Sequence, residues 1–190
     1  MNNPLRTVAK AGRSVLVRTF HPLWRRRATT FLERTPPIDR VLFVCLGNVC
    51  RSPYAEKRML DLLARSDTTS RPAVESAGFI KPGRGSPERA MEVAAERQLD
   101  LSSHTSRVLA QCTADDRTLV VVMEPGQVAG VRDEFGADTL VVALGDLDPG
   151  SPSRRLIPDP WGHPPDVFRS SFDRIDRCLS ELLEHLRRGS

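Results

Sequence analysis

The sequence predicts an α/β protein built on a parallel sheet. Short apolar strands alternate with amphipathic helices along the chain, without an internal repeat, and strands separated by helices run parallel. The chain has 190 residues with 39% apolar content, enough for one core of ordinary size. No apolar run reaches the roughly 18 residues that a membrane-spanning helix needs. These observations favour one soluble domain with an appended segment.

Hydrophobic periodicity places the elements in a definite order. The expected series is a strand over 41–45, a helix over 53–65, a strand over 73–77, a helix over 87–97, a strand over 119–123, a helix over 126–135, a strand over 139–143 and a last helix over 166–187. The Pro-, Gly- and Asp-rich residues 146–163 are expected to form an exposed loop. Parallel sheets bind ligands at the carboxyl ends of their strands, which is where Cys45 falls.

An anion-binding loop is predicted directly after the first strand, in residues 45–52 (Cys-Leu-Gly-Asn-Val-Cys-Arg-Ser). A thiol between a strand end and a helix N-terminus meets the helix dipole and several unpaired N–H groups, which favour a thiolate and a bound phosphate-like anion. Gly47 and Asn48 allow the backbone to curl tightly. The planar guanidinium of Arg51 can bind two phosphate oxygens at once.

A thiolate inside such a loop predicts attack on phosphorus and a cysteinyl-phosphate that water later hydrolyses. The leaving oxygen then needs a proton donor. Asp159 is the candidate, because Pro158 and Pro160 on either side restrict the backbone and fix the direction of its carboxyl group.

Residues 41–56, together with Asp159-Pro160 far downstream, resemble the low-molecular-weight protein tyrosine phosphatases. The pattern of that family is V-C-x-G-N-x-C-R-S-P followed by a late Asp-Pro, and the resemblance extends over roughly residues 38–186. It implies a four-stranded parallel sheet with helices on both faces. It also implies hydrolysis of phosphotyrosine in proteins, without a metal ion or a cofactor.

The resemblance assigns a role to each matching residue. Cys45 would be the nucleophile, Arg51 would bind phosphate, and Asp159 would act as general acid and then as general base. Ser52 would stabilise the thiolate. Further matches are the supporting residues Ser76 and His104, which would hold Asn48 in a strained conformation, and the loop residues Leu46, Gly47, Val49 and Cys50.

Two positions bear on the substrate. Relatives that act on phosphoarginine carry threonine where this chain has Val49, so Val49 favours phosphotyrosine. Trp161 stands where the family commonly has a tyrosine that lines the mouth of the pocket, and it is the expected wall against the substrate ring. In relatives the cysteine matching Cys50 can form a disulfide with the oxidised nucleophile, which would give Cys50 a redox role.

Each residue also has a simpler interpretation. Cys45 and Cys50 could be small core residues, and Asp159 could be an ordinary turn residue. His104 could cap a helix that begins near residue 105, and Ser76 could be a solvent-facing turn residue.

Two other functions remain open. Arsenate reduction on the same fold needs a pair of cysteines downstream of the nucleophile, but Cys112 has no second cysteine close behind it. A non-catalytic module that binds phosphorylated ligands would need neither the thiol of Cys45 nor the carboxyl of Asp159. Both alternatives are therefore disfavoured.

Residues 1–37 form a basic extension before the expected domain, residues 38–190. The first 38 residues carry 8 Lys and Arg against 1 Glu, a net charge of +7, while the other 152 carry 20 basic and 23 acidic residues, a net charge of −3. The extension could be a disordered arm, an organelle transit peptide, or an amphipathic helix on an anionic membrane or acidic partner. The residues that suggest the helix are Val15, Leu16, Val17, Phe20, Leu23 and Trp24, interleaved with Arg13, Arg18 and Arg25 to Arg27.

The expected partners are phosphotyrosine proteins, among them a tyrosine kinase of polysaccharide export, and not nucleic acid. The 4 cysteines match neither a disulfide framework nor a zinc pattern. A working thiolate requires a reducing compartment, so a cytoplasmic location is expected.

Overall fold

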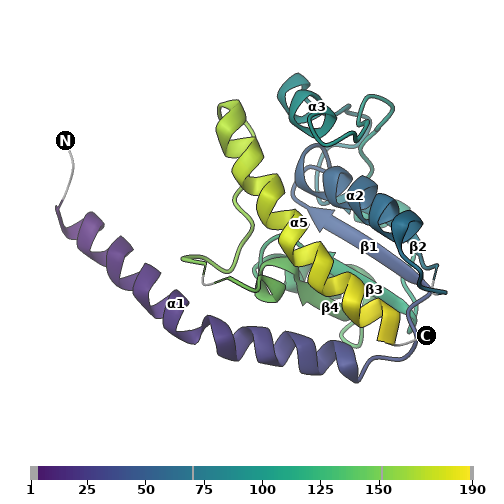
Figure 1. Ribbon diagram of the computed structural model, residues 1–190, viewed down its shortest axis with the longest axis horizontal. Coiled ribbons are helices and arrows are strands. Elements are labelled where there is room, and N and C mark those ends of the chain that lie inside the picture. The colour runs from purple at the N-terminus through teal and green to yellow at the C-terminus, as the bar shows by residue number, and fades with distance from the viewer. Residues whose placement is uncertain (1–3, 70, 151, 189–190) are drawn as a thin grey trace.

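The computed structural model describes residues 4–69, 71–150 and 152–188, with side chains from residue 16 onward within these ranges. Its centre is a four-stranded parallel sheet with the strand order β2-β1-β3-β4 (Figure 1). The strands are β1 (Arg40–Cys45), β2 (Ala73–Gly78), β3 (Thr118–Val122) and β4 (Leu140–Ala143). The predicted four-stranded parallel sheet is confirmed, with strand ends within about one residue of those expected.

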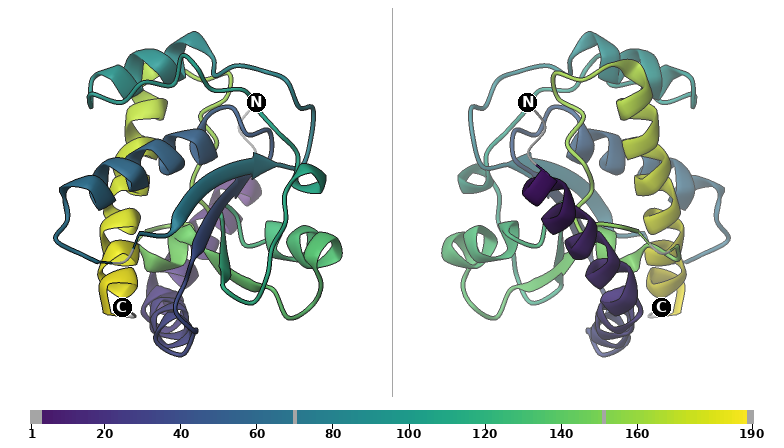
Figure 2. Two further views of the ribbon diagram at one scale, coloured as in Figure 1. Left: turned by 90° about the vertical axis from the view of Figure 1, so that its right-hand side faces the viewer. Right: turned by 90° about the vertical axis from the view of Figure 1, so that its left-hand side faces the viewer.

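Helices cover both faces of the sheet. On one face α2 (Arg51–Arg65) packs against α5 (Pro165–Arg188), and α3 (Glu88–Ala95) contacts α5. On the other face α4 (Gln127–Phe135) contacts β3 and β4 (Figure 2). Two short 3-10 helices are also present: η1 (Leu109–Gln111) precedes β3, and η2 (Leu144–Leu147) follows β4.

Each face of the sheet has its own core. In β1 the side chains of Val41 and Phe43 join the larger cluster with α2 and α5, whereas Leu42 and Val44 join the smaller cluster with α4. All five residues of β3 are buried. Because both faces are covered, the central strands β1 and β3 appear in the sequence as nearly continuous apolar runs rather than as alternating ones.

The prediction of an exposed loop over residues 146–163 was wrong for its first part. Asp146 and Asp148 are 6% and 1% exposed. Arg155 binds Asp146 through two hydrogen bonds of 2.8 and 2.6 Å, and Arg174 lies 2.8 Å from Asp148. Carboxylates can be buried when each is paired with a hydrogen-bonded cation, and the composition of a loop does not reveal such partners.

The basic extension contains a long helix, α1 (Pro4–Glu33), which continues through Pro22. Its later turns contact η2 and α5, and its first turns extend away from the sheet (Figure 1). His21, Ala28 and Leu32 are buried, whereas Leu16, Phe20 and Leu23 are exposed. The side chains of Arg13 and Val15 lie outside the described residues. Among the helices that the structure describes, none is both long enough and apolar enough to span a membrane.

Candidate active site

The loop between β1 and α2 lies at the carboxyl edge of the sheet. Cys45 is the last residue of β1 and pairs with Gly78 at the end of β2. A Cβ atom on Gly78 would lie 2.8 Å from the backbone nitrogen of Asn48 and 2.9 Å from the carbonyl oxygen of Leu46. Gly78 therefore allows the loop to rest directly on β2, since any side chain there would push it away.

Cys45 lies among hydrogen-bond donors. Its Sγ accepts a hydrogen bond from the backbone N–H of Asn48 at 3.2 Å and lies 3.1 Å from Oγ of Ser52. The thiol is only 3% exposed and sits just before the N-terminus of α2. Donors and the positive end of a helix dipole both stabilise a thiolate relative to a thiol.

Asn48 holds the loop in its shape. Its φ of 51° is in the left-handed region, which few residues other than glycine adopt. Its side-chain amide donates to Ser52 at 3.0 Å and to Ser76 at 2.8 Å, and its Oδ1 accepts from the backbone of Arg107 at 2.9 Å. Nε2 of His104 lies 2.7 Å from the carbonyl oxygen of Asn48. The structure thus brings both predicted supporting residues onto Asn48.

The simpler interpretations of these two supporting residues do not fit. No helix begins near residue 105, because residues 105–107 have no regular structure and the next helical residues are those of η1. Ser76 is 2% exposed and donates to Glu56 at 2.5 Å, so it is not a solvent-facing turn residue.

Arg51 is buried beneath the loop, with 1% of its surface exposed. Its Nη2 lies 2.7 Å from Asp159, and its Nη1 lies 2.8 Å from Glu124 and 3.0 Å from the carbonyl oxygen of Ile157. Its Nε is buried and has no hydrogen-bond partner among the described residues. A buried guanidinium with an unsatisfied donor fits a ligand oxygen, because leaving such a group unpaired is costly.

Asp159 reaches the site from a constrained segment. The backbone N–H of Ile157 donates to Met123 at 2.8 Å, and the hydroxyl of Ser171 donates to the carbonyl oxygen of Pro158 at 2.9 Å. The second carboxyl oxygen of Asp159 accepts from the backbone of Trp161 at 3.2 Å. These bonds hold the carboxyl group in the pocket that contains Cys45.

That pocket has a volume of about 240 Å³. Cys45 and Arg51 lie in it, and the buried side chain of Val49 lines it. Its lining also includes three exposed apolar residues, Leu46, Ile80 and Trp161, and two cationic residues, Lys81 and Arg84. Trp161, the expected wall against the substrate ring, lines this pocket with 55% of its surface exposed.

The other thiols differ from Cys45 in surroundings. Burial, reinforced by the neighbouring Cys45 and Asp159, raises the pKa of Cys50, so this residue remains a protonated thiol near neutral pH. Burial also raises the pKa of Cys112. Cys112 packs against the core beneath α4 and does not line the pocket.

Sequence reasoning missed several residues of the site. Glu124 could have been suspected, because it lies just beyond β3 and the carboxyl ends of parallel strands share one edge. Arg84 donates to the carbonyl oxygen of Gly47 at 2.9 Å and so supports the loop. Neither Arg84 nor Glu56 carries a local pattern that distinguishes it from the many other charged residues of the chain.

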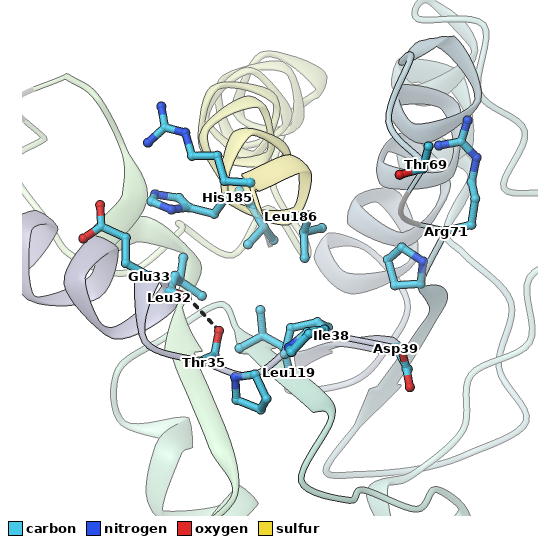
Figure 3. Close-up of a pocket in the computed structure, with 15 residues that line it drawn as sticks. Leu32, Glu33, Thr35, Ile38, Asp39, Thr69, Arg71, Leu119, His185 and Leu186 are labelled. Carbon is cyan, nitrogen blue, oxygen red and sulfur yellow. Dashed lines mark hydrogen bonds between the residues drawn. The ribbon is translucent and has the colours of Figure 1, made fainter. Parts of the chain in front are cut away.

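A larger cavity, of about 580 Å³, lies at the amino edge of the sheet, between the end of α1 and the end of α5 (Figure 3). Leu119 and Leu186 line it from opposite sides, and Glu33 and His185 lie close together at one side. None of the residues that line the Cys45 pocket also lines this cavity.

Known proteins are similar in sequence to most of this chain. The family model described as low molecular weight phosphotyrosine protein phosphatase matches residues 40–190. The protein tyrosine phosphatase Wzb of Salmonella typhi is 31% identical over 149 residues, which are 78% of this chain and 94% of that protein. A protein-arginine-phosphatase of Bacillus subtilis is 29% identical over 150 residues, with 78% and 97% covered.

A solved structure has a similar fold. The tyrosine phosphatase amsI of Erwinia amylovora matches with a TM-score of 0.65 and 26% identity, over 77% of this chain and 92% of that one. The family match covers the loop, both supporting residues and Asp159, while α1 lies before it. The chain belongs to the low-molecular-weight phosphotyrosine protein phosphatase family.

Proposed function

We propose that this protein hydrolyses phosphotyrosine in proteins through a cysteinyl-phosphate on Cys45. The observation that carries the proposal is the buried Arg51, which lines the same pocket as Cys45 and Asp159 and whose Nε has no hydrogen-bond partner among the described residues. Two oxygens of a bound phosphate would replace the present partners of the guanidinium, and the pairing with Asp159 would loosen as the phosphate enters.

In the first step, the thiolate of Cys45 attacks phosphorus and the bond from phosphorus to the phenolic oxygen breaks. Asp159 gives its proton to that oxygen, so the tyrosine leaves as a neutral phenol. The N–H groups of the loop and Arg51 stabilise the charge on the oxygens of the phosphoryl group as it is transferred.

In the second step, Asp159, now a carboxylate, takes a proton from water as the water oxygen attacks phosphorus. The bond from sulfur to phosphorus breaks, which releases inorganic phosphate and restores the thiolate. Ser52 supports the leaving thiolate, because its hydroxyl lies 3.1 Å from the sulfur.

Two features of the pocket support phosphotyrosine over other phosphorylated residues. The apolar side chains of Leu46, Ile80 and Trp161 suit an aromatic ring. Val49 offers no hydroxyl group to a guanidinium. Phosphoarginine is the second candidate, because a relative of similar identity is named as an arginine phosphatase.

The experiment is hydrolysis of matched phosphotyrosine, phosphoserine and phosphoarginine peptides, with a chelator present. We expect the phosphotyrosine peptide to be turned over fastest, with all turnover lost in Cys45→Ser. Faster turnover of phosphoarginine would assign the other substrate. No turnover of any peptide would favour a binding module, and reduction of arsenate would revive that alternative despite the position of Cys112.

We also propose that α1 brings the enzyme to anionic membranes, where a membrane-bound tyrosine kinase, such as one of polysaccharide export, would be its substrate. Leu16, Phe20 and Leu23 are exposed and recur at a spacing of four and three residues, so they share one side of the helix. Arg27, four residues after Leu23, lies on the same side of the helix, and the extension carries a net charge of +7. An apolar stripe with basic neighbours suits an anionic lipid surface.

Co-sedimentation of the full chain with vesicles tests this second proposal. We expect binding to vesicles rich in phosphatidylserine, weak binding to pure phosphatidylcholine, and loss of binding in the double variant Leu16→Glu/Phe20→Glu. If the wild type and the double variant both remained in the supernatant with phosphatidylserine vesicles, the proposal of membrane binding would be contradicted. A location on the cytoplasmic side of the membrane is part of the same proposal, because the thiols of Cys45 and Cys50 need reducing conditions.

A further inference from the structure

The helix α1 has a second face, which is turned toward the domain. His21 is 1% exposed, and its Nε2 lies 3.1 Å from the carbonyl oxygen of Gly145 in η2. One turn later, the ring of Trp24 stacks under the guanidinium of Arg155, 4.6 Å from the ring centroid. These contacts join an element outside the family match to residues inside it.

The two contacted segments form one unit. Arg155 binds Asp146 of η2 through both of its hydrogen bonds, at 2.8 and 2.6 Å. A Cβ atom on Gly145 would lie 1.8 Å from the carbonyl oxygen of Arg155, so the two backbones are in direct contact. His21 contacts η2 and Trp24 contacts Arg155, so both residues of α1 contact the same unit, which consists of η2 and the residue Arg155 that is bound to it.

Arg155 lies only four residues before Asp159, and the chain between them has little freedom. Arg174 donates to the carbonyl oxygens of Arg154 and Leu156, each at 2.7 Å. The backbone N–H of Ile157 donates a hydrogen bond to the carbonyl oxygen of Met123, and Pro158 restricts the backbone directly before Asp159. A displacement of Arg155 would thus be passed to Asp159 rather than absorbed by a flexible loop.

The carboxyl group needs accurate placement, because a general acid must lie within hydrogen-bond reach of the leaving oxygen. Misplacement by about 1 Å can cost as much as a hundredfold in rate. Cys45 and Arg51 are positioned by β1, α2 and their own loop, and no hydrogen bond joins either of them to the described residues of α1. A change at the inner face of α1 is therefore expected to act on proton transfer and not on attack or on phosphate binding.

We propose that His21 and Trp24 of α1 are positioning residues for Asp159, so that the appended helix sets the efficiency of the general acid. This inference rests on the proposed cysteinyl-phosphate mechanism. It makes the extension a part of the catalytic apparatus and not only a means of localisation.

The test compares two substrates in the full chain, without membranes. Phosphotyrosine peptide has a basic leaving oxygen and needs the proton of Asp159, whereas 2,4-dinitrophenyl phosphate has a weakly basic one and does not. We expect Trp24→Ala and His21→Leu each to lower kcat/KM on the peptide by about threefold to tenfold, which corresponds to a modest loss of placement. Because kcat/KM reports the steps up to transfer of the phosphoryl group to Cys45 and excludes its later hydrolysis, in which Asp159 is the base, kcat/KM on the dinitrophenyl ester should change by less than about twofold.

Conservative variants and a control sharpen the test. Trp24→Phe keeps an aromatic ring beneath Arg155 and His21→Gln keeps a donor, so both should recover most of kcat/KM on the peptide. Thr30→Ala removes a side chain of α1 that makes none of these contacts, and it should match the wild type. Equal losses of kcat/KM on both substrates would indicate a purely structural role and overturn the inference, as would unchanged kcat/KM on the peptide.

Hydrogen exchange provides a readout that does not depend on turnover. The backbone amide of Ile157 should exchange faster in Trp24→Ala than in the wild type, while the amides of β1 should be unchanged. Unchanged exchange at Ile157 would overturn the inference even if the wild type proved inactive. If the wild type were inactive but Ile157 exchanged faster in Trp24→Ala, the proposed function would be contradicted, whereas the link between α1 and the segment before Asp159 would be supported.

Discussion

The pocket at Cys45 and the cavity beside His185 lie at opposite ends of the same sheet, and they differ in volume, lining and use of charge. The pocket at the carboxyl edge is the smaller, about 240 Å³ against about 580 Å³. Its charged groups converge, with Arg51 buried and bonded to two carboxylates. In the larger cavity, Asp39 forms an ion pair with Arg117, and aliphatic side chains such as Leu119 and Leu186 line the cavity.

The comparison shows that the volume of a cavity does not by itself identify the catalytic site. At the carboxyl edge, strand ends and the N-terminus of α2 supply unpaired N–H groups, and these favour an anion and a thiolate. At the amino edge, the sheet offers no comparable set of donors around a nucleophile, since none of the cysteines lines that cavity. Changes at the two ends should therefore have different effects on activity.

The largest effect is expected from Cys45→Ser, because a hydroxyl is a far weaker nucleophile than a thiolate at neutral pH. Turnover of phosphotyrosine peptide should fall on the order of 10⁴-fold or more. Cys112→Ala is the matched control, since it removes a thiol that does not line the pocket, and it should keep wild-type kcat. Comparable losses in both variants would show that the two regions are not chemically distinct.

Asp159→Asn is expected to have the next largest effect. The amide cannot supply the proton, so kcat/KM on phosphotyrosine peptide should fall by about 10² to 10³-fold, whereas kcat/KM on the dinitrophenyl ester should be much less affected. Steady-state kinetics on both substrates measure the difference, and kcat itself should fall on both, because the variant also lacks the base of the second step. If kcat/KM fell equally on both substrates, Asp159 would be acting on binding or on loop shape and not as an acid.

Asn48→Ala should have an intermediate effect, on both stability and rate. The variant loses the hydrogen bonds to Ser52, Ser76 and Arg107, and it places alanine at a φ of 51°, which costs about 1–2 kcal/mol. We expect a lower Tm and a kcat reduced roughly tenfold, because the donors to phosphate lose their alignment.

Asn48→Gly separates the two causes of that loss, since glycine adopts this φ without strain but makes none of the side-chain bonds. Calorimetry should show partial recovery of Tm without recovery of kcat. Full recovery of kcat in Asn48→Gly would mean that the side-chain bonds are unimportant for catalysis.

The smallest effect is expected at the far cavity, from His185→Gln. Burial, with Arg188 nearby, lowers the pKa of His185 from its ordinary 6.5, although Glu33 opposes the shift. The unfolded chain therefore binds this proton more readily than the folded one, and the wild type loses stability as pH falls through and below about 6.5.

In His185→Gln this part of the acid destabilisation should disappear, so the urea midpoints at pH 8 and pH 5 should lie closer together than in the wild type. The kcat on phosphotyrosine peptide should be unchanged. A steeper pH dependence in the variant would reverse the sign of the argument, and a lost kcat would link the two cavities.

Much of the sheet and the loop could be predicted from the sequence, because local signals agree there. A continuous apolar run identifies β1, the Gly-Asn pair indicates a tight curl, and Arg51 follows at a spacing that a loop around an anion permits. Ser76 and His104 are different, since nothing in their local sequence points to Asn48. Only the resemblance to the family suggested that they meet it.

The partners of Arg51 and of α1 could not be predicted in the same way. Glu124 meets Arg51 across 73 residues of sequence, and such a pairing is decided by packing of the whole fold. Periodicity in α1 groups Trp24 with the apolar residues Leu16 and Phe20, but it cannot say which of them faces a domain. The structure divides them, with Trp24 against Arg155 and the other two exposed.

The most direct test of the central claim is to trap the covalent intermediate. Wild-type enzyme turning over phosphotyrosine peptide would be quenched rapidly and digested, and the phosphorylated residue would be identified by mass spectrometry. The proposed mechanism predicts a phosphoryl group on Cys45 that forms within one turnover and is absent in Cys45→Ser. With 2,4-dinitrophenyl phosphate, which forms the intermediate without the acid, the group should accumulate further in Asp159→Ala because its hydrolysis is slowed. Turnover without a phosphoryl group on Cys45, or with the group on another residue, would contradict it.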